Sequence, residues 1–459
     1  MIMDVNGASG EVRASFRAMP PADQLKNVFG VSRQSGSRKL YVASAINPSS
    51  SFRYARVVVA RFHPDNSADP AFGVDGLAEV SFEGTELSQG IVGSSMAVHT
   101  DGGVAVLVRA IVGPDRGPIV ALVRFNSDGD LDADFGIGGL RVHNFSDLAN
   151  FKQSAGTAQP ALVDVLNVSP VQTGATITSA SGKFFFVAQT SSAPGPGLVV
   201  RFLPGGELDT SFGNDGVIQI VVPGYEGDYV FLQGVTELSN GQIAICGGVR
   251  TYADSVFMCE PKGLVLKLND DGSCDTSFGN QGLVMIDLPE KLSGKDYSNI
   301  YYFQSVAEAS DNCLVCSGEM STYTGGVHSS RGVVVKLEGT GLPDTSFNSG
   351  KVVVFGAQGE FLAFVFAGWQ SNGKVVAAGS VSEQNLYVDP ASAKFIVARF
   401  NPDGAADVSF ARRGWNTASF GPGVNVASAM RLEADSIILA GKYGQKGAVS
   451  ETVVISFFT

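Results

Sequence analysis

The sequence is poor in charge, and its charge is mostly of one sign. Only 17% of the 459 residues are charged, with 32 Lys and Arg against 44 Asp and Glu. A net charge of -12 provides no basic field for phosphate groups, so we expect no nucleic-acid partner and no anionic membrane surface as partner. No run of about 18 apolar residues occurs, so we also expect no membrane span.

Cysteine is scarce as well, and its pattern does not indicate disulfides. There are five, an odd number confined to one part of the chain: Cys246, Cys259, Cys274, Cys313 and Cys316. This favours buried structural thiols in a reducing compartment. The N-terminal sequence MIMDVNGASGEVRASF has no basic segment followed by an apolar one, so we expect no signal peptide. The predicted location is therefore the cytoplasm, or the exterior by a signal-independent route.

What the chain has in quantity is glycine, phenylalanine and one repeated turn. It holds 56 Gly and 30 Phe, a composition typical of all-β proteins with many turns. The turn recurs six times as Asp-x-x-Phe, mostly followed by Gly. Its members are Asp69 and Phe72, Asp132 and Phe135, Asp209 and Phe212, Asp275 and Phe278, Asp344 and Phe347, and Asp407 and Phe410. We interpret the Asp as a turn former whose carboxylate accepts backbone N–H groups.

Strands surround each turn in a fixed order. An apolar run such as VVVARF (57–62) precedes the turn, and a Gly-led strand such as GLAEVSF (76–82) follows it. Two further strands joined by a short hairpin complete a unit of four, the pattern of a propeller blade. Seven sets of three strands occur, which predicts an all-β, seven-bladed β-propeller with four antiparallel strands per blade. The seventh set lacks its fourth strand, and GEVRASF (10–16) has the shape needed to supply it.

The whole chain, 1–459, is accordingly predicted to be a single domain. Its predicted parts are a closing strand at 10–16, blade 1 at about 25–82, blade 2 at about 88–145, blade 3 at about 172–222, blade 4 at about 229–288, blade 5 at about 301–355, blade 6 at about 362–420, and blade 7 at about 424–458 plus 10–16. An insertion, 146–171, precedes blade 3. It is interpreted either as a lid over the central channel or as decoration.

The repeat resembles the delta-60 repeat family of bacterial β-propeller proteins. Segments VRFNSDGDLDADFGIGG (123–139) and LKLNDDGSCDTSFGNQG (266–282) are similar to its signature, R-[LFY]-N-x-D-G-x-L-D-x-x-F-G-x-x-G, almost position by position. The copy at 61–76 lacks the Asp-Gly pair, and the copy near Asp344 is one residue shorter. The resemblance covers nearly the whole chain. It implies a propeller fold and no defined activity.

The two faces of such a propeller differ in sequence. One carries the repeated turns, and the other carries connections of irregular length, such as 251–263, 321–332 and 381–393. Variable loops on a rigid scaffold are typical binding sites, and aromatic rings suit contact with a protein or a glycan. The candidate binding residues on this variable face are Tyr225, Tyr252, Phe257, Tyr297, Tyr323, His328, Tyr387 and Tyr443. We expect a monomeric, non-catalytic binding or scaffold protein.

Other chemistries have weaker support. Asp128, Asp130, Asp132 and Asp134 alternate as in a calcium loop, but two of the four positions vary between repeats, so we predict no metal and no cofactor. Cys313 and Cys316 would point to opposite faces of a strand. Two alternatives remain open. One is a subunit of a secreted or toxin-like assembly. The other is a hydrolase or lyase at the channel mouth, using carboxylates such as Glu319, Asp254, Glu260, Glu383 and Asp389.

Overall fold

The computed structural model describes most of the chain as antiparallel β-structure. The described residues are 8–17, 27–48, 54–110, 119–145, 175–177, 181–189, 196–225, 229–250, 262–287, 301–324, 327–357, 359–383, 392–444 and 451–459. Helical structure among them is limited to short 3-10 segments, such as η3 (Ser310–Asn312) and η4 (Asn348–Gly350). The predicted all-β propeller is confirmed, and no described helix has the length and apolar character needed to cross a membrane.

The strands follow the chain in sets of four. The first half of the chain forms β2 (Asn27–Arg33), β3 (Leu40–Ile46), β4 (Arg56–Phe62) and β5 (Leu77–Ser81); β6 (Ile91–Val98), β7 (Val104–Ala110), β8 (Ile119–Phe125) and β9 (Leu140–Asn144); β10 (Ala175–Ile177), β11 (Phe184–Gln189), β12 (Gly197–Phe202) and β13 (Val217–Ile220). Each set is one four-stranded sheet whose strands pair in chain order.

The second half continues the pattern up to the C-terminal set. It forms β14 (Tyr229–Glu237), β15 (Ile243–Arg250), β16 (Lys262–Leu268) and β17 (Leu283–Ile286); β18 (Tyr301–Glu308), β19 (Leu314–Thr324), β20 (Val327–Leu337) and β21 (Val353–Phe355); β22 (Phe361–Trp369), β23 (Val375–Ser382), β24 (Lys394–Phe400) and β25 (Trp415–Ala418); and β26 (Val424–Leu432), β27 (Ser436–Gly444) and β28 (Glu451–Phe458). The N-terminal strand β1 (Val12–Arg17) joins the last set, in the order β1-β28-β27-β26.

The expected count of seven separate four-stranded sheets is wrong. The described strands form five four-stranded sheets and one eight-stranded sheet, which contains β18 to β25. The two halves of the large sheet meet where Ser330 of β20 bridges Phe361 of β22 in parallel, and Ser330 N donates to Glu360 O over 3.0 Å. Gly332 permits this approach, because a Cβ there would overlap the side chains of Leu362 and Phe364.

The segment 321–332, expected to be an irregular loop, is mostly extended strand. β19 continues to Thr324 and β20 begins at Val327, so the two form a long hairpin. Thr322, Tyr323, Thr324 and Val327 are β-branched or aromatic, and such residues favour this conformation. The extra length of β20 is what brings it beside β22.

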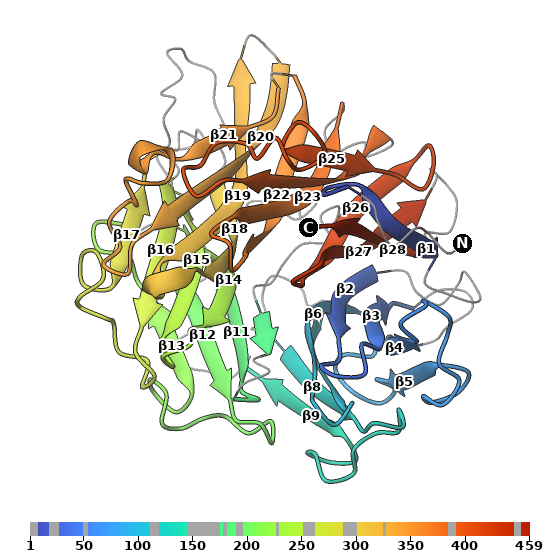
Figure 1. The fold of residues 1–459 in the computed structure, drawn as a ribbon. Helices are drawn as coiled ribbons and strands as arrows, with labels where there is room; N and C mark the ends of the chain where they lie inside the picture. The colour runs from blue at the N-terminus through green and yellow to red at the C-terminus, as the bar shows by residue number, and fades with distance from the viewer. Residues whose placement is uncertain are drawn as a thin grey trace.

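The sets are arranged around a common centre (Figure 1). The first strands of successive sets, β2, β6, β10, β14, β18, β22 and β26, contact one another in chain order, and β26 also contacts β2. Neighbouring sets cover both faces of the middle strands, which explains why β3 is buried along its whole length although its sequence does not alternate. The outer strand β5 alternates between buried and exposed residues instead.

The N-terminal strand completes the last sheet. In β1, Phe16 is the register partner of Val454, and its ring packs against Phe62 of the first set at 5.3 Å between centroids. Apolar residues of β2, β3 and β4 pack with those of β26, β27 and β28 in one buried cluster. The first and last parts of the chain therefore share a core.

Candidate functional site

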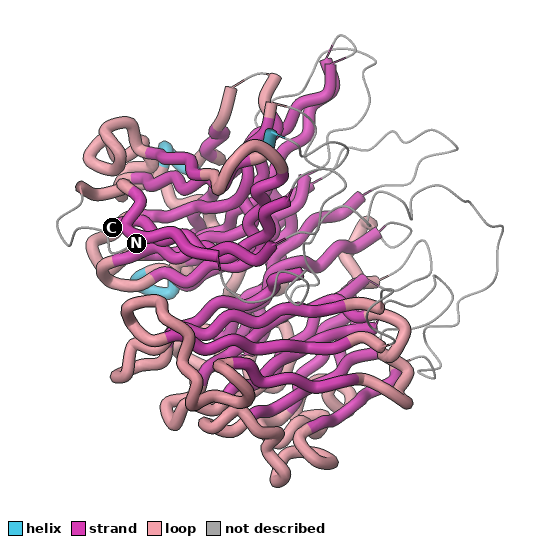
Figure 2. Tube along the Cα trace, turned by 90° about the vertical axis from the view of Figure 1, so that its right-hand side faces the viewer, coloured by secondary structure: helices cyan, strands magenta, loops and turns pink. Residues whose placement is uncertain are grey.

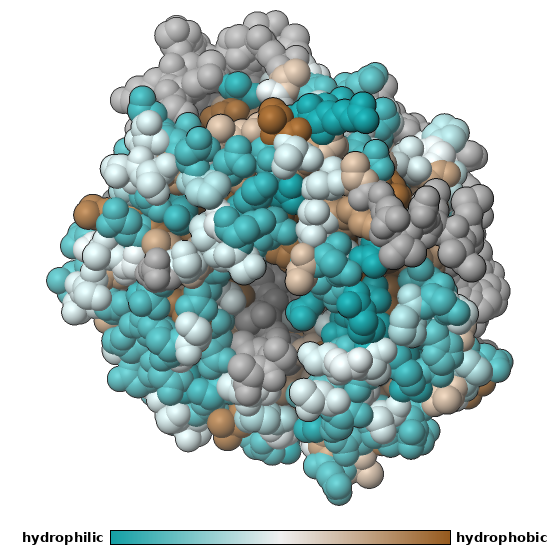
Figure 3. Space-filling model, in the orientation of Figure 1, coloured by the Kyte–Doolittle hydropathy of each residue, from teal (hydrophilic) through white to brown (hydrophobic). Residues whose placement is uncertain are grey.

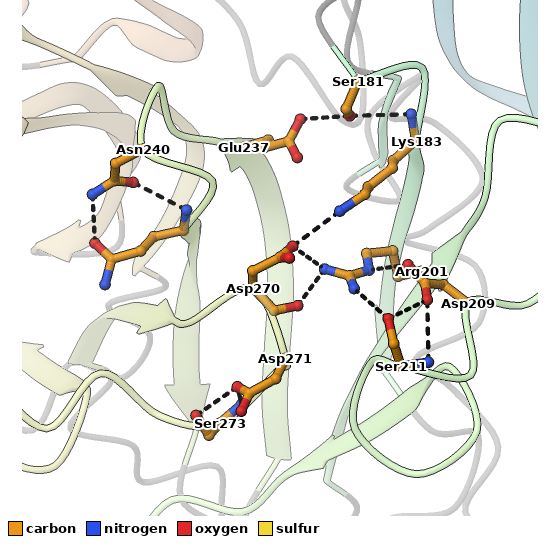
Figure 4. A network of polar contacts seen from close by, with 11 residues as sticks. Ser181, Lys183, Arg201, Asp209, Ser211, Glu237, Asn240, Asp270, Asp271 and Ser273 are labelled. Carbon is orange, nitrogen blue, oxygen red and sulfur yellow. Dashed lines mark hydrogen bonds and ion pairs between the residues drawn. The ribbon is translucent and has the colours of Figure 1, made fainter.

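The repeated turn is built around a buried ion pair (Figure 4). In the β10–β13 set, Arg201 near the end of β12 places Nε 2.8 Å from Asp209 Oδ2. Asp209 Oδ1 accepts hydrogen bonds from Ser211 N and Oγ, at 3.1 and 2.6 Å. The Arg201 guanidinium also lies 4.5 Å from the centre of the Phe212 ring. The recurring Asp and Phe of this repeat thus hold one basic side chain between them.

The other repeats use the same pairing of an Asp with a basic side chain. The basic nitrogen lies 2.7 to 3.4 Å from the Asp Oδ2 in the pairs Arg61–Asp69, Arg124–Asp132, Lys267–Asp275, Lys336–Asp344 and Arg399–Asp407. In each, Asp Oδ1 accepts from the backbone N–H two residues on, as the sequence predicted for a turn former. Because these carboxylates are already engaged, their role is structural.

Five of the six turns are also fastened to a neighbouring segment by a backbone hydrogen bond. The residue after the turn Phe donates its N–H to a hairpin carbonyl of the next set in four pairs: Gly73 to Asp128, Gly213 to Asp271, Gly279 to Thr340 and Asn348 to Asp403. Their N···O distances are 2.6 to 2.8 Å. For the last turn, Ala411 N donates to Ser9 O over 2.7 Å, so the N-terminal segment stands where the next hairpin would be.

These contacts displace the pKa of the turn carboxyls. Burial alone would raise the pKa of Asp407, but hydrogen bonds from Lys374 and Ser409 and the charge of Arg399 outweigh it and hold that pKa well below the usual range. The pKa values of Asp69, Asp209, Asp275 and Asp344 are lowered by the same balance. Ion pairs that are this well satisfied explain the shifts without a catalytic role.

The repeated turns and the short hairpins all lie at one end of the strands, here called the turn end. In Figure 2 the strands run across the view and both chain termini lie at this end. Figure 3 looks onto it and shows a mainly hydrophilic surface. The opposite end, here called the loop end, carries the variable connections between strands.

A groove of about 460 Å³ opens at the loop end, between β21 and the β22–β25 strands. Its apolar lining is Phe355, Leu362, Val381, Ile396 and Trp415, and its polar lining includes Glu360, Ser382, Glu383, Ser392, Lys394 and Thr417. The volume lies within the range of small-ligand and side-chain pockets. Short β21 leaves this face of the β22–β25 strands uncovered.

Local contacts give the groove a rigid aromatic wall. The Phe355 and Trp415 rings meet edge to face at 6.3 Å, and Phe355 also packs against Phe364 and Phe400. Arg413 covers one face of Trp415 at 3.5 Å and donates from Nε to the Trp415 carbonyl. On the rim, Glu360 Oε2 accepts from Ala357 N, and the hydroxyls of Ser382 and Ser392 are 2.7 Å apart.

The four described residues among those predicted to bind lie outside the groove. Tyr225 is half-buried against an apolar cluster, and Tyr443 packs against Phe420 at 6.2 Å between ring centres. Tyr323 and His328 are register partners near the tip of the β19–β20 hairpin. Tyr252, Phe257, Tyr297 and Tyr387 lie outside the described residues, as does the insertion 146–171. None of the four described candidates lines the groove.

The aromatic wall was not predicted, because Phe355 and Trp415 lie on the short outer strands β21 and β25 and not in long loops. A signal existed: Phe355 ends the strand just before an irregular connection, and Trp415 stands where four of the other repeats have an aliphatic residue after Gly. Val381, Ser382, Glu383 and Ser392 of the groove lining belong to the range 381–393, which was predicted to be a variable connection.

The structure also places the residues that were considered for catalysis, metal binding and thiol chemistry. Glu383 is an exposed groove residue, whereas Glu319 is buried in β19, and Asp254, Glu260 and Asp389 lie outside the described residues. Within the described part, no three His, Cys, Asp or Glu side chains gather as metal ligands would. Cys246 and Cys316 lie in one buried apolar cluster, where burial and the neighbouring Cys316 thiol raise the pKa of Cys246.

Comparisons with known proteins agree with the fold class. The family described as "Domain of unknown function (DUF5122) beta-propeller" matches residues 120–135 and 370–410, and this chain is similar to it over those segments. No curated protein matches the sequence.

Several solved structures match this chain at low identity. A protein of unknown function from Dyadobacter fermentans is 11% identical with a TM-score of 0.48, over 98% of this chain and 99% of that one. The polysaccharide lyase Uly1 is 10% identical with a TM-score of 0.47, over 96% and 91%. The β-propeller domain of the Trilobed protease from Pyrococcus furiosus is 6% identical with a TM-score of 0.43, over 94% of each. Likenesses this distant say nothing about what this chain binds.

Proposed function

We propose that this chain is a non-catalytic binding propeller that recognises a partner through the groove at its loop end. The observation that supports this is the composition of the groove: an aromatic and aliphatic floor with a rim of carboxylate, ammonium and hydroxyl groups. A floor of this kind suits an inserted apolar side chain, and the rim suits the polar groups around it. A polypeptide partner therefore fits better than a glycan.

The scaffold behind the groove is proposed to be seven-bladed. In this interpretation the eight-stranded sheet is two blades, at about 301–355 and 362–420, joined by the single parallel bridge at Ser330. The seven first strands that contact one another in a ring support it, as does the strand β1 beside β28. The repeat is further proposed to be related to the delta-60 repeats that it resembles.

The test uses a groove-blocking variant and a matched control. Thr417 of β25 lines the groove and is the register partner of Ile396, and Gln219 of β13 is the corresponding partner of Leu198 but does not line it. Random peptides displayed on phage and an array of immobilised glycans would be probed with the wild-type chain. Binding by enriched peptides should fall at least tenfold in Thr417→Trp and stay unchanged in Gln219→Trp.

Trp415 offers a direct readout. The chain has two tryptophans, Trp369 and Trp415, so the Trp369→Phe variant emits only from the groove. Peptide binding in the groove should change that emission in a saturable way. Equal loss of binding in both blocking variants would contradict the proposal, and so would cleavage of an arrayed glycan, which would favour the hydrolase or lyase alternative.

A further inference from the structure

In three repeats, the basic side chain of the turn also donates a hydrogen bond to a hairpin of the next set. All three side chains are buried, and a buried donor without an acceptor is unfavourable. The bonds run from Arg61 Nη1 to Ser127 O, from Arg201 Nη1 to Asp270 O and from Lys267 Nζ to Gly339 O. The hairpin of the next set therefore supplies the acceptor that each of these buried cations needs.

One of these hairpins also supplies a negative charge (Figure 4). At the junction of the β10–β13 and β14–β17 sets, Asp270 Oδ1 lies 2.7 Å from Arg201 Nη1 and 2.9 Å from Lys183 Nζ. Arg201 also pairs with Asp209 of its own set. Two cations thus meet two carboxylates at this junction, and their charges balance.

The junction of the β22–β25 and β26–β28 sets has the same two cations but lacks the second carboxylate in the described part of the chain. Lys374 directly precedes β23 as Lys183 precedes β11, and Arg399 is the last residue but one of β24, as Arg201 is of β12. Lys374 Nζ and Arg399 Nε both lie 2.7 Å from the same oxygen, Asp407 Oδ2. One carboxylate therefore faces two cations.

Arg399 also lacks the acceptor that the other repeats provide. Its Nη2 donates to Ser9 Oγ over 2.8 Å and to Ser409 Oγ over 3.4 Å, whereas its Nη1 makes no hydrogen bond with the described part of the chain. Arg399 is only 3% exposed, yet Nη1 is not one of the fully buried unpaired atoms. A molecule in the cleft that Arg399 lines can therefore reach this nitrogen.

That cleft has a volume of about 700 Å³ and lies at the turn end, away from the loop-end groove. Arg431 lines it, is exposed and makes no ion pair within the described residues. The one carboxylate of the described lining, Glu433, is already paired with Arg33 at 3.3 Å. The cleft therefore carries unbalanced positive charge, although the whole chain has a net charge of -12.

We propose that this cleft binds the carboxylate of an organic acid or of an acidic residue. A carboxylate accepts hydrogen bonds from the guanidinium groups of Arg399 and Arg431, as Asp270 does from Arg201. Leu432 is part of the lining and suits the carbon skeleton of such a ligand, which a bare inorganic anion lacks. A cation would meet two positive charges, and a neutral ligand would leave them unbalanced.

Binding is measured by isothermal titration calorimetry at low ionic strength, where charges are least screened. The probes are succinate, N-acetylaspartate N-methylamide and the capped peptide NDDGS, which copies residues 269–273 around Asp270. Sodium sulfate and N-acetylasparagine N-methylamide are the inorganic and neutral controls. We expect at least one carboxylate to bind with a Kd below about 10 mM, and neither control to bind. Binding of succinate identifies a small acid as the ligand, and binding of the peptide alone identifies a polypeptide.

Three variants place the binding in the cleft. Arg431→Gln removes one guanidinium and should lower the affinity at least fivefold. Arg412→Gln is the matched control, because Arg412 is exposed at the same end but does not line the cleft, and its affinity should stay unchanged. Ser9→Asp sets a carboxylate beside Arg399, so the melting temperature should stay the same or rise while binding is lost.

Four results would overturn the proposal. The first is that no carboxylate probe binds up to about 10 mM. The second is that sulfate binds as tightly as the carboxylates, which would indicate an adventitious ion only. The third is that Arg412→Gln weakens binding as much as Arg431→Gln, and the fourth is that Ser9→Asp binds the ligand as the wild-type chain does.

Discussion

The two ends of the strands are built on opposite plans. At the turn end, each repeated turn pairs an Asp with a basic side chain, which in four of the turns also lies over the turn Phe. Five of the turns are fastened to a neighbouring segment by a backbone hydrogen bond. At the loop end, the connections differ from set to set, and the aromatic groove lies beside one of them. The difference indicates that the repeated residues maintain the ring, and that recognition uses residues that do not repeat.

Deleting residues 1–17 should have the largest effect on this plan. The deletion removes β1 from beside β28 and also removes Ser9 from the last repeated turn. We expect a loss of well over about 4 kcal/mol in unfolding free energy, or aggregation through the exposed edge of β28. Deleting only residues 1–7 is the control and should leave thermal melting unchanged. Equal melting of both truncated chains would show that the N-terminal strand does not hold the ring.

Asp407→Asn should have the next largest effect. Asp407 and Arg399 are each 3% exposed, so the substitution leaves a buried guanidinium without its counter-charge. We expect a loss of about 3–5 kcal/mol in denaturant unfolding. Asp132→Asn is the matched control, because the Arg124–Asp132 pair is exposed by 29% and 24% and should contribute about 1 kcal/mol or less. Similar losses at both sites would show that burial does not set the strength of these pairs.

The same carboxyls predict how stability depends on pH. The folded-state pKa of Asp407 lies below the unfolded value, so its contribution is present above the ordinary carboxyl pKa and is lost as pH falls through the folded value. Asp69, Asp209, Asp275 and Asp344 add to this in the same direction. The unfolding free energy should therefore decrease below about pH 4, and less steeply in Asp407→Asn. An equal slope in both proteins would contradict the assignment.

The structure of the turn end could be predicted from the sequence better than that of the loop end, for a physical reason. Asp-x-x-Phe turns and apolar runs recur, and recurrence exposes local rules such as the Asp that caps its own turn. The pairing of β20 with β22 depends on the length of β20 and on Gly332. Neither feature is part of the repeat, so the repeat does not predict the pairing. Register shifts in the first strands, for example between Phe364 and Phe366, were equally invisible in the sequence.

The groove could be anticipated only in part. Its polar rim includes Glu383, from a connection whose irregular length was visible in the sequence. Its aromatic wall joins Phe355 and Trp415, which are distant in the sequence and meet only because consecutive sets pack side by side. A contact across two sets needs the geometry of the ring, and a repeat pattern alone does not supply that.

A smaller effect is expected where two repeats approach most closely. Gly404 has φ of 82°, and a Cβ there would lie 2.7 Å from Asn348 N, the group fastened to Asp403. Gly404→Ala should therefore cost about 1–3 kcal/mol in unfolding free energy. Gly241 has φ of 84° with nothing within 4 Å of an added Cβ, so Gly241→Ala isolates the backbone strain alone. If Gly404→Ala costs no more than the control, the close approach between sets is not important for stability.

The smallest effect should come from the exposed ion pairs that Asp435 of the last hairpin makes with Arg13 and Arg38. Asp435 lies 2.8 Å from Arg13 of β1 and 3.3 Å from Arg38, but its side chain is 47% exposed. Exposed pairs contribute little and are screened by salt, so Asp435→Asn should cost about 0.5 kcal/mol at low ionic strength and almost nothing in about 1 M NaCl. Thermal melting at both salt concentrations checks this. A loss as large as that of Asp407→Asn, unchanged by salt, would mean that surface charge and not buried pairing closes the ring.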